Sequence, residues 1–124
     1  QALIQSTTVS ADRNPEYNTN PGNDTTDKVF LLSITEAEQY FDSDEARRCA
    51  PTAYAKAQGA YASDDYKTAD GDPTGWRWLR SPGNSNIQNN AACVINDGSV
   101  SSYGRSVDGE HACVRPAIWV SLES

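Results

Sequence analysis

The chain has few basic residues for its size. Its 124 residues include 10 Lys and Arg against 17 Asp and Glu, which gives a formal net charge of -7 and a pI near 4.5. Nucleic-acid binding needs Lys and Arg to replace phosphate counterions, and anionic lipid surfaces also attract basic segments. We therefore expect no nucleic-acid partner and no anionic membrane surface as a partner. The acidity is interpreted as a contribution to solubility.

Long apolar runs are missing as well. No stretch approaches the roughly 20 apolar residues of a spanning helix, and no signal-peptide pattern occurs. We expect no membrane insertion. Because the chain begins at Gln1 rather than Met, we also expect that upstream sequence has been removed or lies elsewhere.

Residues that carry catalytic or metal chemistry are scarce. Cys49, Cys93 and Cys113 make an odd number without C-x-x-C spacing, so the pattern indicates neither a disulfide framework nor a zinc site. A bridge between Cys93 and Cys113 stays open. His111 is the only histidine, and no G-x-S-x-G segment surrounds any serine. A hydrolase triad is not supported, and His111 is interpreted as an exposed binding or incidental residue.

The remaining sequence predicts one α+β domain over residues 1–124. Residues 1–27 are rich in Thr, Asn, Asp, Pro and Gly and predict an extended, loop-rich lead-in. A buried strand is expected at Lys28–Leu32. A helix then begins at Ser33, where Ser33 and Glu36 stand in capping-box register, and a second helix is expected at Pro51–Gln58.

The C-terminal half predicts an antiparallel sheet. Asp97-Gly98 separates two strand-like segments, which is a strong hairpin signal. The expected strands are Trp76–Leu79, Ala91–Asn96, Ser99–Tyr103 and Val114–Leu122, and residues 61–74 are expected to be a solvated connection. Alternating Trp76 and Trp78 are interpreted as sharing a buried face. Arg80 and Arg115 are interpreted as structural groups that hydrogen-bond loop carbonyls.

Several motifs resemble a bacterial domain family of unassigned function. They are Asp27–Ser33 with Glu36-Ala37 and Tyr40-Phe41, Arg48-Cys49, Pro51-Thr52 with Tyr54-Ala55, Trp78–Gly83, and Val114–Ala117. The resemblance extends from about Thr26 to Val120. That family is similar to the C-type-lectin-fold group related to formylglycine-generating enzymes. It implies two helices packed on a small twisted antiparallel sheet. The family's upstream Ser-x-x-Arg-x-Trp-Leu-Asn segment is absent, so we expect the chain to be part of a longer domain.

The same fold serves the variable proteins of diversity-generating retroelements, which carry hypermutated residues near the C-terminus. Such diversification acts at template adenines, typically in Asn codons, and cannot produce Lys, Glu, Gln, Met or Trp. Between Asn84 and Cys113 only Gln88 and Glu110 fall outside the reachable set, and no Lys follows Lys67. Ordinary loops are also rich in Asn, Ser and Gly, so a plain-loop interpretation stays open.

The resemblance implies a non-enzymatic domain that recognises a protein or another macromolecular ligand, in an extracellular or cell-surface setting. Tyr103 and Arg105 are expected to anchor the ligand, with adaptable Ser and Asn contacts around them. The predicted ligand-binding residues are Arg77, Asn84, Ser85, Asn86, Asn89, Asn90, Ser101, Ser102, Tyr103, Arg105, Ser106, Asp108 and His111.

Two other functions stay open. One is a structural or interaction module of a bacterial surface protein without a diversified face. The other is a formylglycine-generating-type enzyme, for which Cys93 and Cys113 invite comparison although the catalytic segment is not repeated around them. No cofactor is expected. Asp64-Asp65 and Asp70-Gly71-Asp72 lack an EF-hand register, which leaves only a structural calcium ion open.

Overall fold

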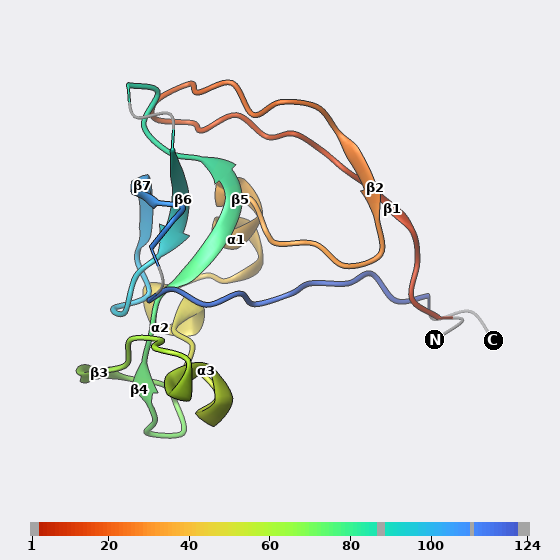
Figure 1. The fold of residues 1–124 in the computed structure, drawn as a ribbon. Helices are drawn as coiled ribbons and strands as arrows, with labels where there is room; N and C mark the ends of the chain where they lie inside the picture. Colours follow the sequence, from red (N-terminus) through yellow and green to blue (C-terminus); the bar gives the residue numbers. More distant parts are fainter. Residues whose placement is uncertain (1–2, 87–88, 110, 122–124) are drawn as a thin grey trace.

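The computed structural model describes residues 3–86, 89–109 and 111–121. These residues form a mixed α+β structure, as expected, with short helices and small antiparallel sheets (Figure 1). The helices are α1 (Ile34–Tyr40), α2 (Asp44–Arg47) and α3 (Ala53–Ala57). The strands are β1 (Thr7–Val9), β2 (Thr25–Asp27), β3 (Ser63–Lys67), β4 (Pro73–Thr74), β5 (Arg77–Pro82), β6 (Asn90–Val94) and β7 (Val100–Ser106).

The largest sheet is an antiparallel meander in the order β5-β6-β7. β6 and β7 are joined by the turn at Asp97-Gly98, where Gly98 adopts a positive φ of 92° and its N–H donates to the carbonyl of Ile95. The predicted hairpin is therefore confirmed. β5 runs from Arg77 to Pro82, so it extends beyond Leu79, where we expected this strand to end.

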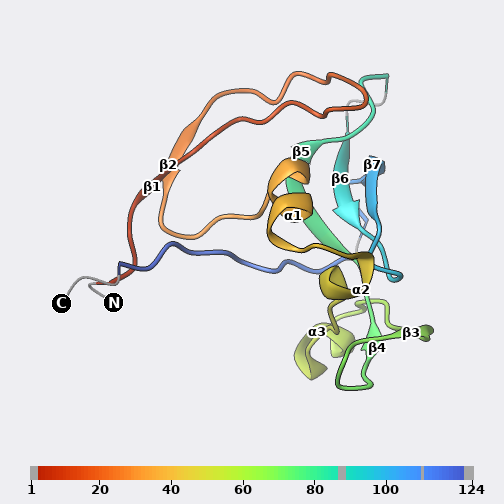
Figure 2. The same cartoon turned by 180° about the vertical axis from the view of Figure 1, so that it is seen from behind.

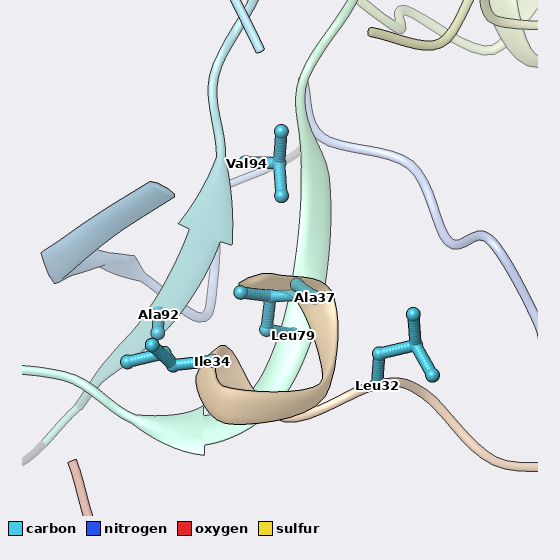
Figure 3. Close-up of a cluster of buried hydrophobic side chains, with 6 residues drawn as sticks. All are labelled: Leu32, Ile34, Ala37, Leu79, Ala92 and Val94. Carbon is cyan, nitrogen blue, oxygen red and sulfur yellow. The ribbon is translucent and has the colours of Figure 1, made fainter. Parts of the chain in front are cut away.

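Helix α1 covers one face of this sheet, and the main core lies between them (Figures 2 and 3). The helix begins where the sequence predicted. The Ser33 side chain accepts from the Glu36 N–H, and the Glu36 carboxylate accepts from the Ser33 N–H. The buried apolar cluster consists of Leu32, Ile34, Ala37, Leu79, Ala92 and Val94.

The other helices sit near the start of β5, together with the β3–β4 pair (Figure 1). The second predicted helix is present as α3, with Thr52 as its N-cap. Helix α2 was not expected, and its last residue Arg47 and its C-cap Arg48 hold the β6–β7 turn. Arg47 Nε donates to the carbonyl of Gly98 at 3.0 Å, and Arg48 Nε donates to the carbonyl of Asp97 at 2.8 Å.

The predicted strands at 28–32 and 114–122 are corrected by the structure. Their described residues make only isolated bridges, Phe30 with Ala117 and Ile4 with Val120, and Leu122 lies outside the part of the chain that the structure describes. Val29 is 57% exposed and Val114 is 61% exposed, so these apolar residues are not the buried strand interiors that we expected. Pro116 has no N–H to donate, which limits continuous pairing of the C-terminal segment.

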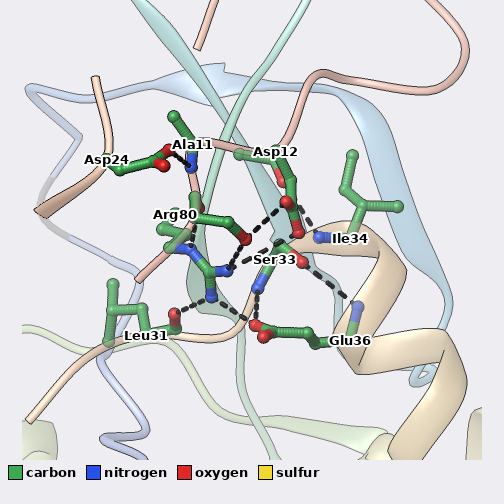
Figure 4. Close-up of polar contacts among 10 residues, drawn as sticks. Ala11, Asp12, Asp24, Leu31, Ser33, Ile34, Glu36 and Arg80 are labelled. Carbon is green, nitrogen blue, oxygen red and sulfur yellow. Dashed lines mark hydrogen bonds and ion pairs between the residues drawn. The ribbon is translucent and has the colours of Figure 1, made fainter. Parts of the chain in front are cut away.

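Arg80 ties the lead-in and α1 to the outer edge of β5 (Figure 4). Its guanidinium donates to the carbonyls of Leu31, at 2.9 Å, and Ser10, at 3.1 Å. It also pairs with the carboxylate of Glu36. The structural role predicted for Arg80 is confirmed. None of the helices in the described part of the chain is long and apolar enough to cross a membrane.

Candidate functional site

The most exposed part of the predicted ligand surface lies where the β5–β6 loop meets the end of β7. We call this the rim and define it as Ser85, Asn86, Asn89, Asn90, Tyr103 and 106–108. Backbone hydrogen bonds hold it together. The Asn84 N–H donates to the carbonyl of Tyr103 at 2.9 Å, and the Val107 N–H donates to the carbonyl of Asn89 at 2.8 Å.

Two glycines allow the rim backbone to pack this closely. A Cβ added at Gly83 would lie 2.5 Å from the carbonyl oxygen of Tyr103. At Gly104, φ is +85° and an added Cβ would lie 2.2 Å from the carbonyl oxygen of Ala91. Larger residues are excluded at both positions, so the path of the rim depends on its glycines and its backbone hydrogen bonds.

Most predicted ligand-binding residues are accessible, and they fall into two groups. Those with exposed side chains are Ser85, Asn86, Asn89, Tyr103, Arg105, Asp108 and His111. Those that are half-buried are Asn90, Ser101, Ser102 and Ser106. Within the rim, Asn89 Nδ2 donates to Ser106 Oγ at 3.1 Å, and the Ser106 hydroxyl donates to the carboxylate of Asp108.

Two predicted residues are not on the surface. Arg77 is only 3% exposed, because alternation along β5 places it on the same face as the buried Leu79, under α1 and the segment that follows it. Asn84 is 9% exposed, and its side-chain oxygen accepts from the Asn86 N–H at 2.7 Å. The expectation that Arg77 and Asn84 contact a ligand on the surface is corrected: Asn84 instead shapes the loop.

The lead-in contributes residues that the sequence did not reveal. Asn14 is 1% exposed, and its Nδ2 donates to the carbonyls of Pro82 (2.9 Å) and Ser102 (2.6 Å). The Tyr17 ring then meets the Tyr103 ring edge to face, with centroids 6.0 Å apart. Glu16 accepts a hydrogen bond from the Ser102 hydroxyl. No local signal predicts these contacts, since their partners lie far away in the sequence.

His111 does not lie on the rim, contrary to the prediction that it shares one surface with Asn86 and Tyr103. Its Nδ1 is 3.1 Å from the carbonyl oxygen of Gly59, which directly follows α3. Helix α3 lies at the opposite end of β5 from the β5–β6 loop (Figures 1 and 2). The backbone carbonyl of His111 also accepts from the Tyr61 N–H at 3.0 Å.

Arg105 joins a different group of side chains from Tyr103. Its guanidinium carbon lies 4.3 Å from the centroid of the Trp76 ring, and the Tyr61 ring lies 5.9 Å from Trp76. Trp76 Nε1 donates to the side-chain oxygen of Asn96 at 3.3 Å. Trp76 and Trp78 are both only half-buried, so the face that they were predicted to share is not the main core.

The cysteines are free thiols in this structure. Cys49, Cys93 and Cys113 are all unbridged. Burial raises the pKa of the Cys93 thiol, and burial together with the neighbouring Cys49 raises the pKa of the Cys113 thiol. Both are therefore protonated at neutral pH, which makes them poor nucleophiles because the thiolate is the reactive form. Within residues 3–86, 89–109 and 111–121, no three His, Cys, Asp or Glu side chains gather to hold a metal ion.

Comparison with known proteins identifies the family. A family model described as Domain of unknown function (DUF6273) matches residues 1–122, so the chain belongs to this family. No curated protein matches the chain. No solved structure matches it either.

Proposed function

We propose that this member of the DUF6273 family is a non-enzymatic ligand-recognition domain whose rim contacts a protein or another macromolecule. The observation that carries the proposal is that the rim backbone is held in place while several rim side chains remain exposed. Backbone hydrogen bonds, two glycines and the buried Asn14 set its path, while the side chains of Ser85, Asn86 and Asn89 are exposed. Rigid elements that present loop side chains are typical of recognition surfaces.

The rim has a composition suited to binding. Tyr103, 47% exposed, offers a large amphipathic ring, and the rings of Tyr103 and Tyr17 support one another. The surrounding Ser, Asn and Asp side chains supply adaptable hydrogen bonds. Tyrosine anchors among small polar residues are also characteristic of antibody paratopes.

The proposal includes a C-type-lectin-like fold and a diversified rim, as in the variable proteins of diversity-generating retroelements. Exposed substitutions that break no specific contact usually change the free energy of unfolding by less than about 0.5 kcal/mol. A rim held by its backbone therefore accepts many side chains. We place the domain outside the cell or on a cell surface, where a variable binding surface meets its targets.

The state of the cysteines supports binding over catalysis. Cys93 is fully buried, and the raised pKa values of Cys93 and Cys113 keep both thiols protonated. The His111 ring, at the other end of the sheet, faces the Gly59 carbonyl. Neither arrangement resembles a nucleophile that is activated by an adjacent base.

Two matched libraries displayed on phage test the proposal. The rim library randomises Ser85, Asn86, Asn89, Tyr103 and Asp108. The control library randomises Asn14, Gly83, Asn84, Ala92 and Gly104. Protease resistance measures folding, and selection against a panel of purified proteins measures binding. We expect most rim variants to fold and to yield specific binders, whereas most control variants unfold.

The coding sequence distinguishes a diversified rim from the alternative, a bacterial surface interaction module with a constant face. A nearby imperfect repeat of the 84–113 coding region, differing only at adenines, supports diversification. Its absence, together with identical rim residues in independent isolates, supports the constant module. Rim variants that unfold as often as the control variants would contradict both the diversified rim and its role as a recognition surface.

A further inference from the structure

A cavity of about 500 Å³ lies away from the rim, near α3. Its walls come from the segment leading into α3, from α3 itself, from the start of β5, and from residues 112–116. Its apolar lining includes Pro51, Ala55, Trp76, Val114 and Pro116. The volume falls within the range of about 300–1,000 Å³ that is usual for small-molecule sites.

Two arginines line this cavity, beside the polar side chains of Thr52 and Gln58. Arg77 is only 3% exposed, and Arg115 is half-buried. Their guanidinium carbons lie 5.6 Å and 5.0 Å from the centroid of the Phe41 ring, so one aromatic ring brings the two cations together. We call Arg77 and Arg115 the arginine pair.

The arginine pair has unused hydrogen-bond donors. Arg77 Nη2 donates to the carbonyl of Arg47 at 3.4 Å, but Arg77 Nε and Arg115 Nη1 are buried and have no hydrogen-bond partner among the described residues. Arg115 was predicted to hydrogen-bond loop carbonyls, but its Nη1 makes no such bond to any residue that the structure describes. Buried polar groups nearly always have a partner, so the two guanidiniums are incompletely satisfied, although neither of these two atoms has appreciable surface open to the cavity.

The electrostatics agree with this interpretation. Burial, followed by the neighbouring charge of Arg115, lowers the pKa of Arg77 to about 10, so the Arg77 guanidinium stays charged at neutral pH. Within the described ranges, Arg77 and Arg115 form no ion pair, while the nearby Arg47 is paired with Asp44. A local excess of positive charge thus lies inside a chain whose net charge is -7.

We infer that the cavity binds a carboxylate carried on a small apolar body, with the carboxylate against the arginine pair. A guanidinium presents parallel N–H donors that match the two oxygens of a carboxylate. The apolar walls would hold the hydrocarbon part of the ligand. A monoanion suits this site better than phosphate, because the cost of removing an ion from water rises steeply with its charge. This inference is independent of the rim.

Phenylacetate is a suitable probe, and phenylacetamide is its uncharged match. In calorimetric titration at neutral pH we expect phenylacetate to bind at least about tenfold more tightly than phenylacetamide, with inorganic phosphate not competing. The Nε–H resonances of Arg77 and Arg115 should shift during the phenylacetate titration. Equal binding of acid and amide, competition by phosphate, or no binding of phenylacetate up to about 10 mM would overturn the inference.

Variants locate the binding to this cavity. Arg115→Gln should weaken phenylacetate binding at least about tenfold. Ala55→Phe fills the cavity from α3 without altering the arginine pair and should block binding, while Ala53→Phe, at an exposed α3 position outside the cavity lining, should not. Should Arg115→Gln fail to fold, the two α3 variants still decide the outcome. Unchanged binding in Ala55→Phe would show that phenylacetate binds elsewhere and would overturn the inference.

Discussion

Tyr17 and Tyr103 meet edge to face, with ring centroids 6.0 Å apart and planes at 78°. The first residue belongs to the lead-in and the second to β7, so the contact joins the N-terminal segment to the sheet. Asn14 reinforces the same junction through its bonds to Pro82 and Ser102. The rim is thus a composite of segments that are distant in the sequence.

The tyrosine pair should be measurable as a coupling energy. Tyr17→Ala and Tyr103→Ala each remove the same ring contact, and edge-to-face pairs contribute about 0.5–1.5 kcal/mol beyond their buried area. A double-mutant cycle of urea unfolding should therefore return a coupling within that range. A coupling near zero would show that the rings do not interact in solution.

Asn14→Ala should destabilise the domain strongly. The substitution removes two donors to backbone carbonyls and an acceptor for the N–H groups of Glu16 and Tyr17, all at a side chain that is 1% exposed. Leaving such groups unsatisfied should lower the free energy of unfolding by about 2–4 kcal/mol. The control Asn86→Ala, at an exposed rim position, should change it by less than about 0.5 kcal/mol. Equal effects in urea unfolding would be inconsistent with a buried clamp.

Gly104→Ala should be more harmful than Gly22→Ala, although both glycines have φ above +80°. Gly22 has open space around it, so its variant suffers only backbone strain of about 1 kcal/mol. At Gly104 the added Cβ also meets the Ala91 carbonyl at 2.2 Å. We expect a loss of at least about 3 kcal/mol there, or failure to fold, measured by thermal unfolding. Comparable losses in the two variants would refute the close approach of β6 and β7 at Gly104.

Asp97 should make stability depend on pH at the β6–β7 turn. Hydrogen bonds from Ser99 lower its pKa below the ordinary 3.8, with Ser99 Oγ at 2.6 Å and Ser99 N–H at 2.8 Å. The unfolded chain therefore binds a proton at Asp97 more readily than the folded chain does. The ionised Asp97 contributes its full share to the free energy of unfolding above the unfolded pKa, and this share is lost as the pH falls through the folded pKa. As the pH is lowered, the free energy of unfolding should therefore fall less in Ser99→Ala than in the wild type, which unfolding curves at several pH values measure. An unchanged pH profile would count against the hydrogen bonds.

The cysteines allow a test by alkylation without reductant. Cys49, Cys93 and Cys113 are free, so the denatured protein should take up three iodoacetamide labels by mass spectrometry. In the native state Cys93, at 0% exposed and with a raised pKa, should react slowest. A single label after denaturation would reveal a disulfide.

Local signals in the sequence were sufficient for several elements. The Ser33–Glu36 capping box and the Asp97-Gly98 turn depend on side chains and backbone within a few residues of each other. Their physical causes are therefore contained in short segments, and both predictions are confirmed. The α+β class followed from the same segments.

Only the tertiary structure decided which surfaces are buried and which strands pair. The sequence placed Arg77 and Trp78 on opposite faces of β5, as the structure has them. It could not show that the face with Arg77 is covered while the face with Trp78 is more accessible. The run at 28–32 is apolar but lacks a continuous partner, because strand pairing requires a second segment in register. Asn14, Tyr17 and the arginine pair owe their positions to distant contacts, which no local pattern encodes.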